Sequence, residues 1–132
     1  MTRVFLDANV LFSAAWREGA GLTRLWEITS LHLVTSHYAA DEAQRNLVRK
    51  RPDGVARLAA LLHALEVTSA LVSLDEGHGL PPKDAPILAA AVASRCGVLL
   101  TGDIADFGHV IGRTLQGVRI LTPSMLLAEI NP

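Results

Sequence analysis

The amino-acid sequence predicts an α/β fold in which helices pack on a central, mainly parallel sheet. Short apolar runs of strand length alternate with longer segments of helical periodicity along the whole chain. Two of these apolar runs are followed within three residues by an acid, Asp7 and Asp103. No repeat, low-complexity segment or linker interrupts the 132 residues, so we expect one domain spanning residues 1–132.

Composition excludes several classes of protein. Hydrophobic residues make up 50% of the chain, but charges interrupt every apolar run well before the ~20 residues that a membrane span needs. The N-terminal residues resemble neither a signal peptide nor a transit peptide, so we expect a cytoplasmic protein with no membrane partner. Cys96 is the single cysteine, which excludes an intramolecular disulfide and a zinc site built on a cysteine pair.

The first third of the chain predicts two strands and two helices. Residues 4–6 form an apolar strand that ends at Asp7. A short helix over residues 9–16 and a second helix over residues 22–29 follow, the latter from its i, i+3, i+4, i+7 apolar spacing. Residues 31–35 are the second strand.

The middle of the chain continues the alternation. Ser36 is a predicted N-cap for a helix that runs to about Lys50. Pro52 is expected in the first turn of the next helix, whose apolar periodicity extends to Glu66. Residues 71–74 are then predicted to form the third strand.

The last third contains the clearest helix. Pro86 is tolerated only in a first turn, so the helix is predicted to begin near Asp84, and Gly97 is its expected C′ residue. A buried strand over residues 98–101 follows it. A short strand over residues 119–121 and a helix that opens at Pro123 complete the chain.

Four acids are predicted to meet at the carboxyl ends of the strands, where ligands bind in open α/β sheets. They are Asp7, Glu42, Asp84 and Asp103. Each acid also has a purely structural explanation. Asp7, or Asn9 beside it, can cap the first helix, and Asp84 can cap its own helix. Glu42 can pair on the helix surface with Arg45 or Asn46.

The convergence of the four acids predicts a metal site. Two carboxylates ~4 Å apart repel by about 4 kcal/mol at an effective dielectric constant of ~20, so such a cluster must take up protons or hold a cation. Oxygen ligands without neighbouring Cys or His favour Mg²⁺ or Mn²⁺. Such an ion activates water and neutralises a phosphoryl group, which makes phosphodiester hydrolysis the expected reaction class.

The sequence around these acids resembles the PIN-domain ribonuclease family. The resemblance rests on four segments of this chain, in this order: residues 5–10 (FLDANV), Glu42, residues 84–91 (DAPILAAA), and residues 100–103 (LTGD) with Asp106 and Phe107. It implies a PIN-like three-layer α/β/α fold and metal-dependent cleavage of single-stranded RNA.

The same resemblance implies roles for individual residues and partners. Asp7, Glu42, Asp84 and Asp103 would be the catalytic and metal-binding acids, although Asp41 competes with Glu42. Asn9 and Thr101 would support them, and Asp106 would be an additional acid. The chain is most similar to the stand-alone VapC-type toxins of toxin–antitoxin pairs, which implies a separate antitoxin protein and a homodimer.

A cluster of cations is the candidate RNA-binding surface. Five of the twelve Lys and Arg residues fall within residues 45–57. Such a cluster is usually a solvated face, but beside a nuclease site it suits contacts with phosphates. We assign RNA contacts to four of its members, Arg45, Arg49, Lys50 and Arg51.

Two other functions remain open at this stage. An aspartyl-phosphate phosphatase would use Asp7 as nucleophile, but it needs a second acid at position 9, where this chain has Asn9. A catalytically silent PIN-like module would bind RNA or a protein without cutting, and the presence of all four acids argues against it.

Overall fold

The computed structural model describes residues 1–69, 80–82 and 84–130, and contains a six-stranded sheet with the order β3-β2-β1-β4-β6-β5. All neighbouring strands pair in parallel except β5 and β6, which are antiparallel, so the predicted mainly parallel sheet is confirmed. The strands are β1 (Thr2–Leu6), β2 (Leu31–Ser36), β3 (Glu66–Thr68), β4 (Val98–Leu100), β5 (Thr114–Leu115) and β6 (Val118–Leu121).

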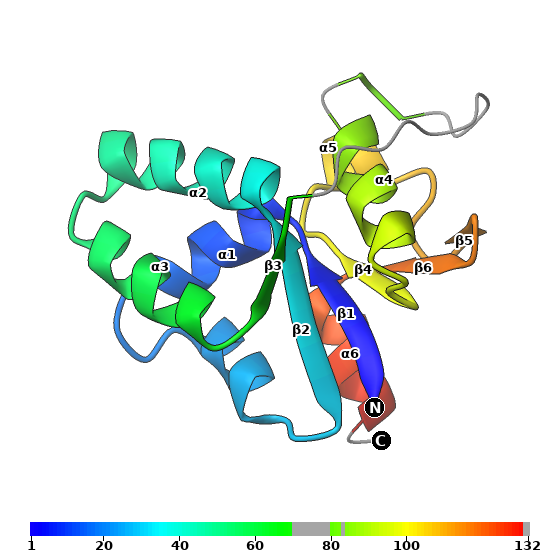
Figure 1. Cartoon of the computed structure of the whole chain (residues 1–132), viewed down its shortest axis with the longest axis horizontal. Helices are drawn as coiled ribbons and strands as arrows, with labels where there is room; N and C mark the ends of the chain where they lie inside the picture. The colour runs from blue at the N-terminus through cyan, green and yellow to red at the C-terminus, as the bar shows by residue number, and fades with distance from the viewer. Residues whose placement is uncertain (70–79, 83, 131–132) are drawn as a thin grey trace.

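Helices flank this sheet, as predicted. Figure 1 shows α1, α2, α3 and the 3₁₀ helix η1 gathered on one side, and α4 and α5 on the other. None of the helices in the described residues is long and apolar enough to cross a membrane. The bounds are α1 (Ala8–Ala15), η1 (Gly21–Glu27), α2 (His37–Lys50), α3 (Gly54–His63), α4 (Ala85–Ala93), α5 (Ile104–Phe107) and α6 (Pro123–Ile130).

Strand β1 is the centre of the sheet. It pairs with β2 on one edge and β4 on the other, and Val4, Phe5 and Leu6 are fully buried. The chain leaves β1 toward β2 in one direction and later returns to β4 on the opposite side. The carboxyl ends of β1 and β4 therefore form a topological switch point, where a ligand crevice is expected.

Three helices pack closely at Gly54, the first residue of α3. A Cβ atom at this position would lie 2.8 Å from Leu47 Cδ2 of α2 and 2.9 Å from the Ala15 carbonyl oxygen of α1. Both distances are too short for a side chain, so glycine lets the three helices approach one another.

The prediction that the helix after Pro52 extends to Glu66 was wrong. Helix α3 ends at His63, and Glu66, expected in this helix, instead begins β3 opposite Val34. The carboxylate of Glu66 then binds His32 of the adjacent strand β2 and Arg3 of β1, one strand farther along the sheet. Sheet pairing and these side-chain hydrogen bonds override the helical periodicity. The strand predicted over residues 71–74 lies outside the described residues.

Three smaller predictions about helix ends also need correction. The helix expected over residues 22–29 is the 3₁₀ helix η1, and Pro52 lies in the turn before α3 rather than in its first turn. Helix α4 ends at Ala93, with Arg95 in the left-handed region at φ 59°. Gly97 is not its C′ residue, because its amide and carbonyl groups pair with Arg3 and Arg119 of the sheet.

The hairpin formed by β5 and β6 was not predicted from the sequence. Strands β5 and β6 are joined by Gln116 and Gly117, both at positive φ (51° and 84°). Two central residues at positive φ are typical of a tight type I′ hairpin turn. The Gln-Gly pair is a weak turn signal, and β5 is only two residues long, so periodicity could not identify it.

Two arginines of the basic cluster bind the C-terminal end of α1. Arg57 donates from Nε to the Ala15 carbonyl oxygen (2.9 Å) and from Nη2 to that of Trp16 (2.7 Å). Arg51 Nε also donates to the Trp16 carbonyl oxygen (2.9 Å). A helix leaves its last carbonyls without intrahelical partners and carries partial negative charge there, so these cations stabilise the end of α1.

This arrangement predicts that Arg57→Met lowers the free energy of unfolding by about 1–3 kcal/mol, because charged hydrogen bonds to two carbonyls are lost while the apolar stem is retained. Urea denaturation followed by circular dichroism measures it. Arg45→Met on the outer face of α2 is the control, expected to change stability by no more than about 0.5 kcal/mol. Equal stability of the Arg57 variant and the wild type would contradict the assigned role.

Candidate active site

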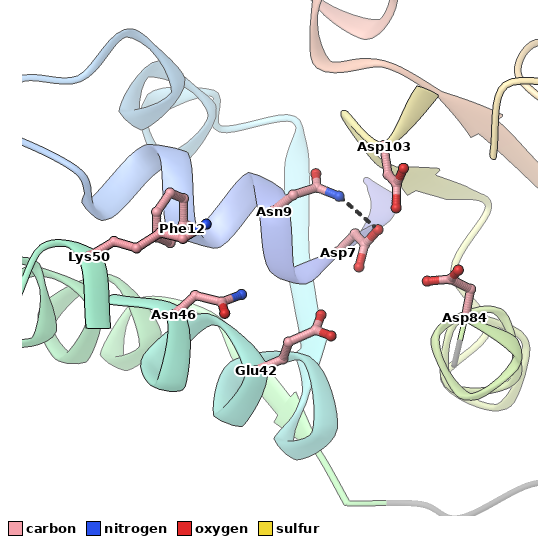
Figure 2. A pocket seen from close by; sticks show the side chains of 8 residues that line it. All are labelled: Asp7, Asn9, Phe12, Glu42, Asn46, Lys50, Asp84 and Asp103. Atoms are coloured by element: carbon pink, nitrogen blue, oxygen red, sulfur yellow. Dashed lines mark hydrogen bonds between the residues drawn. The ribbon is translucent and has the colours of Figure 1, made fainter. Parts of the chain in front are cut away.

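One pocket brings the four predicted acids together at the carboxyl ends of β1 and β4. Figure 2 shows carboxylates from separate segments facing a common space. The pocket has a volume of about 260 Å³, which accommodates a hydrated ion, since each water occupies about 30 Å³ in the liquid. Its lining residues are Asp7, Asn9, Phe12, Glu42, Asn46, Lys50, Asp84 and Asp103.

Asp7 is the most buried of these acids, with 3% of its surface exposed. Oδ1 caps α1 by accepting from the Ala8 amide at 2.7 Å. Oδ2 accepts from Thr101 Oγ1 at 2.8 Å and from Asn9 Nδ2 at 3.1 Å. Asp7 therefore does cap α1, as one of its two sequence-based explanations predicted, but capping uses only one carboxylate oxygen. The second oxygen is held at the edge of the pocket by the two residues predicted to support it.

Burial changes the acidity of Asp7. Removal from water raises its pKa from 3.8 to about 6, and the negative charges of Glu42 and Asp103 act in the same direction. Hydrogen bonds from Thr101 and the Ala8 amide oppose the increase without cancelling it. The metal-free site thus holds a carboxylate that gains or loses a proton close to neutral pH.

Asn9 and Thr101 connect the two strand ends. Asn9 Oδ1 accepts from the Gly102 amide at 2.7 Å, and its Nδ2 lies 3.3 Å from Thr101 Oγ1. Thr101 Oγ1 in turn accepts from the Asp103 amide at 3.1 Å. This network places Asp103 relative to Asp7, so a change at Asn9 or Thr101 would disturb both acids.

Three aspartates form a close carboxylate group at the strand ends. Asp84, Asp103 and Asp106 each offer an oxygen within 4.8 Å of the other two. Asp103 caps α5 by accepting from the Asp106 amide at 3.0 Å. Asp84 is buried at the N-cap position of α4, but its side chain makes no cap hydrogen bond. Capping alone therefore does not account for the Asp84 carboxylate.

The adjacent residues Glu42 and Asp41 of helix α2 point in different directions. Glu42 lines the acidic pocket, whereas Asp41 is exposed and lies in a different groove with Arg45 and Arg49. Adjacent residues of a helix point about 100° apart, so only one of the two acids can face the strand ends.

The predicted RNA-binding cations occupy three different environments. Lys50 lines the acidic pocket, with Nζ 5.9 Å from the centre of the Phe12 ring. Arg51 stacks over Trp16 at 4.8 Å and contacts the end of α1. Arg45 and Arg49 lie in the groove on another face of α2.

Phe12 and Asn46 line the pocket but were not assigned to it from the sequence. Their spacing from the predicted site residues on the two helices could have identified them. Glu42, Asn46 and Lys50 follow one another at i, i+4 and i+8 on α2, and Phe12 is three residues after Asn9 on α1. Their place in the pocket depends on how α1 packs against α2.

The donor set suits a hard divalent cation. All the grouped side chains offer carboxylate oxygens, which Mg²⁺ and Mn²⁺ prefer, and no Cys or His joins the group among the described residues. A parallel α/β fold with clustered carboxylates at the switch point defines a class of proteins whose acidic site suits metal-assisted chemistry on phosphates.

Comparison with known proteins identifies the family. The PIN domain family profile matches residues 3–105, and the chain belongs to this family. No curated protein sequence matches the chain.

Two solved structures share the fold. The chain is similar to VapBC2 from Rickettsia felis bound to a DNA fragment from its promoter (14% identity, TM-score 0.64, 92% of this chain and 98% of that one). It is also similar to Mycobacterium tuberculosis VapC20, a sarcin–ricin loop cleaving toxin (17% identity, TM-score 0.55, 77% of this chain and 92% of that one).

The raised pKa of Asp7 predicts how metal-free stability depends on pH. The folded state holds the Asp7 proton more tightly than the unfolded state, so the free energy of unfolding falls as pH rises from about 4 through the folded-state pKa of about 6, and is level above about pH 7. Between pH 5 and 7.5 the Asp7 contribution is about 1 kcal/mol.

Urea denaturation in EDTA at these two pH values measures this contribution. Asp7→Asn removes the titrating group, so the wild type should lose about 1 kcal/mol more than the variant between pH 5 and 7.5. The two proteins are compared by how much their free energy of unfolding changes with pH, not by its absolute value. This comparison cancels the destabilisation caused by placing an amide opposite the Asn9 and Thr101 donors. Parallel pH profiles would refute the assignment.

Proposed function

We propose that residues 1–132 act as one PIN domain that hydrolyses phosphodiester bonds of single-stranded RNA, with Mg²⁺ or Mn²⁺ as cofactor. The observation that supports this most strongly is the meeting of Asp7, Glu42, Asp84 and Asp103, from four separate segments, in one pocket at the strand ends. The family of the chain and the VapC-like fold agree with this proposal.

The aspartates of the pocket would hold the cation. Asp84, Asp103 and Asp106 each offer a carboxylate oxygen within 4.8 Å of the other two. Asp7 lines the same pocket as Asp84 and Asp103. When bound, Mg²⁺ or Mn²⁺ supplies a nucleophilic water at neutral pH and neutralises charge on the phosphoryl group. Thr101 and Asn9 orient the Asp7 carboxylate, as outer partners of metal ligands commonly do.

Glu42 belongs to the proposed catalytic set from the opposite wall of the pocket. Figure 2 shows its carboxylate directed from α2 toward the aspartates at the strand ends. This position adds negative charge to the cation site and offers an oxygen that can accept a proton from an attacking water.

The structure favours this proposal over a phosphatase. The second acid that an aspartyl-phosphate phosphatase needs is replaced by Asn9, whose amide binds Asp7, Thr101 and the Gly102 backbone. Asn9 is thus a positioning residue that cannot act as a general acid. A silent binding module would not need four acids in one pocket.

Partners and location follow from the proposed function. We propose that the chain is the toxin of a type II toxin–antitoxin pair, that a separate antitoxin protein binds it, and that it forms a homodimer. The structure similar over 92% of this chain is described as a VapBC complex, which supports the antitoxin partner. Cleavage of cellular RNA would place the protein in the cytoplasm.

A cation site made of carboxylates predicts metal-dependent stability. A ligand that binds only the folded state at 100 times its Kd adds about 2.7 kcal/mol, which corresponds to a rise in Tm of roughly 10 °C for a domain of this size. Differential scanning fluorimetry with Mn²⁺ against EDTA measures this rise. Glu42→Gln should reduce it, whereas Asp41→Asn, one residue away but outside the pocket, should not. Identical melting curves with Mn²⁺ and EDTA would count against the site.

Asp84→Asn tests the catalytic role, because asparagine caps a helix about as well as aspartate but carries no charge. We expect wild-type protein to cut single-stranded RNA with Mn²⁺ in an EDTA-sensitive manner. Asp84→Asn and Asp103→Asn should each reduce the rate by at least about 100-fold.

The assay compares the variants at equal foldedness by circular dichroism, with Asp41→Asn as the matched control that retains activity. Full activity of the Asp84→Asn variant would contradict the catalytic role and would indicate that Asp84 serves only as the N-cap residue of α4.

A further inference from the structure

The acidic pocket has a second end that is chemically different from the first. Helix α2 carries Glu42, Asn46 and Lys50 along one stripe, about 12 Å long at 1.5 Å per residue. At one end the stripe faces the aspartates. At the other, Asn46 and Lys50 lie beside Phe12 of α1 (Figure 2).

Phe12 packs against Trp16, but the two polar groups beside it, on Asn46 and Lys50, are not used by the fold. Within the described part of the chain, the half-exposed Asn46 amide has no hydrogen-bond partner. Lys50 forms no ion pair with a described carboxylate, and its ammonium group lies near the Phe12 ring. By contrast, the neighbouring Arg51 is held by the Trp16 carbonyl and ring. The second end therefore presents an aromatic ring, an amide and a cation to the pocket.

We propose that Phe12, Asn46 and Lys50 form a subsite for the RNA nucleotide next to the phosphate that is cut, and that Asn46 selects its base. The inference rests on the proposed ribonuclease function. The base stacks on the Phe12 ring, as unpaired bases do on aromatic side chains. The Asn46 amide, with an NH2 group that donates and a carbonyl oxygen that accepts, pairs with the edge of the base. Lys50 moves from the ring to the adjoining phosphate.

The charge distribution of the pocket explains why Lys50 lies at the end away from the aspartates. The four acids repel RNA, and the bound metal offsets that repulsion only near the scissile phosphate. Lys50 supplies positive charge farther along the pocket, where the next phosphate would otherwise meet only a neutral surface. Arg45 and Arg49 face a different groove, so they cannot replace it.

Base selection is tested by cutting a randomised single-stranded RNA library with Mn²⁺ and sequencing the new ends. The wild type should favour one base beside the cut by at least about fivefold, the lower limit for a paired amide. Asn46→Ala should reduce this preference to near onefold while cutting continues. Gln44→Ala, on another face of the same helix, should retain it. A preference that survives in Asn46→Ala, or is lost equally in Gln44→Ala, overturns the assignment.

Binding is measured separately from cutting, in the Asp103→Asn background with fluorescein-labelled RNA hexanucleotides. Phe12→Leu, which keeps an apolar side chain against Trp16, should weaken binding about tenfold. Lys50→Gln should reduce the slope of log affinity against log salt by about 0.7, the value for one phosphate of a single strand.

The two measurements separate this proposal from the general one. A wild type that cuts RNA, with variants that bind and select bases as it does, retains the ribonuclease and overturns the subsite. A wild type that cuts no RNA overturns the ribonuclease and, with it, the place of the subsite beside a cut phosphate. The binding series then still decides whether Phe12 and Lys50 hold a nucleotide: weaker binding by both variants supports this, and equal binding overturns it.

Discussion

The hydrogen bond from Thr101 to Asp7 is the constraint on which the site depends. It joins the carboxyl ends of two parallel strands that are 94 residues apart in the sequence, and Asn9 strengthens the link by binding both residues. The backbone repeats the connection, because the Asp7 amide donates to the Leu100 carbonyl oxygen. An acid that is nearly excluded from water is stable there only because donors surround it.

The same constraint links stability to function. Burial raises the pKa of Asp7 to about 6, so the metal-free protein holds an acid that is partly protonated near neutral pH. A bound cation would favour the ionised carboxylate and offset the repulsion from Glu42 and Asp103. The arrangement is unfavourable for the fold alone and suited to a cation, which is common where a site serves chemistry rather than stability.

The basic cluster shows how one segment divides its residues between fold and site. Arg51 and Arg57 bind the carbonyls at the end of α1, and thereby hold the helix that carries Asn9 and Phe12. Lys50 lines the pocket instead. The two roles separate where α2 ends, because Lys50 is the last residue of α2, Arg51 is its C-cap and Arg57 belongs to α3.

The sequence alone determined the α/β class and the mainly parallel sheet, because apolar periodicity and acids at strand ends are local patterns. The resemblance of four short segments to PIN-domain ribonucleases indicated the family, which the family profile confirms. The sequence also identified the four acids that share the pocket. Only the tertiary structure decided that Glu66 belongs to a strand, that Asp41 faces away from the strand ends, and that Phe12 and Asn46 border the acids. Each of these depends on pairing and packing between segments distant in the chain, where contacts with neighbouring elements outweigh local propensity.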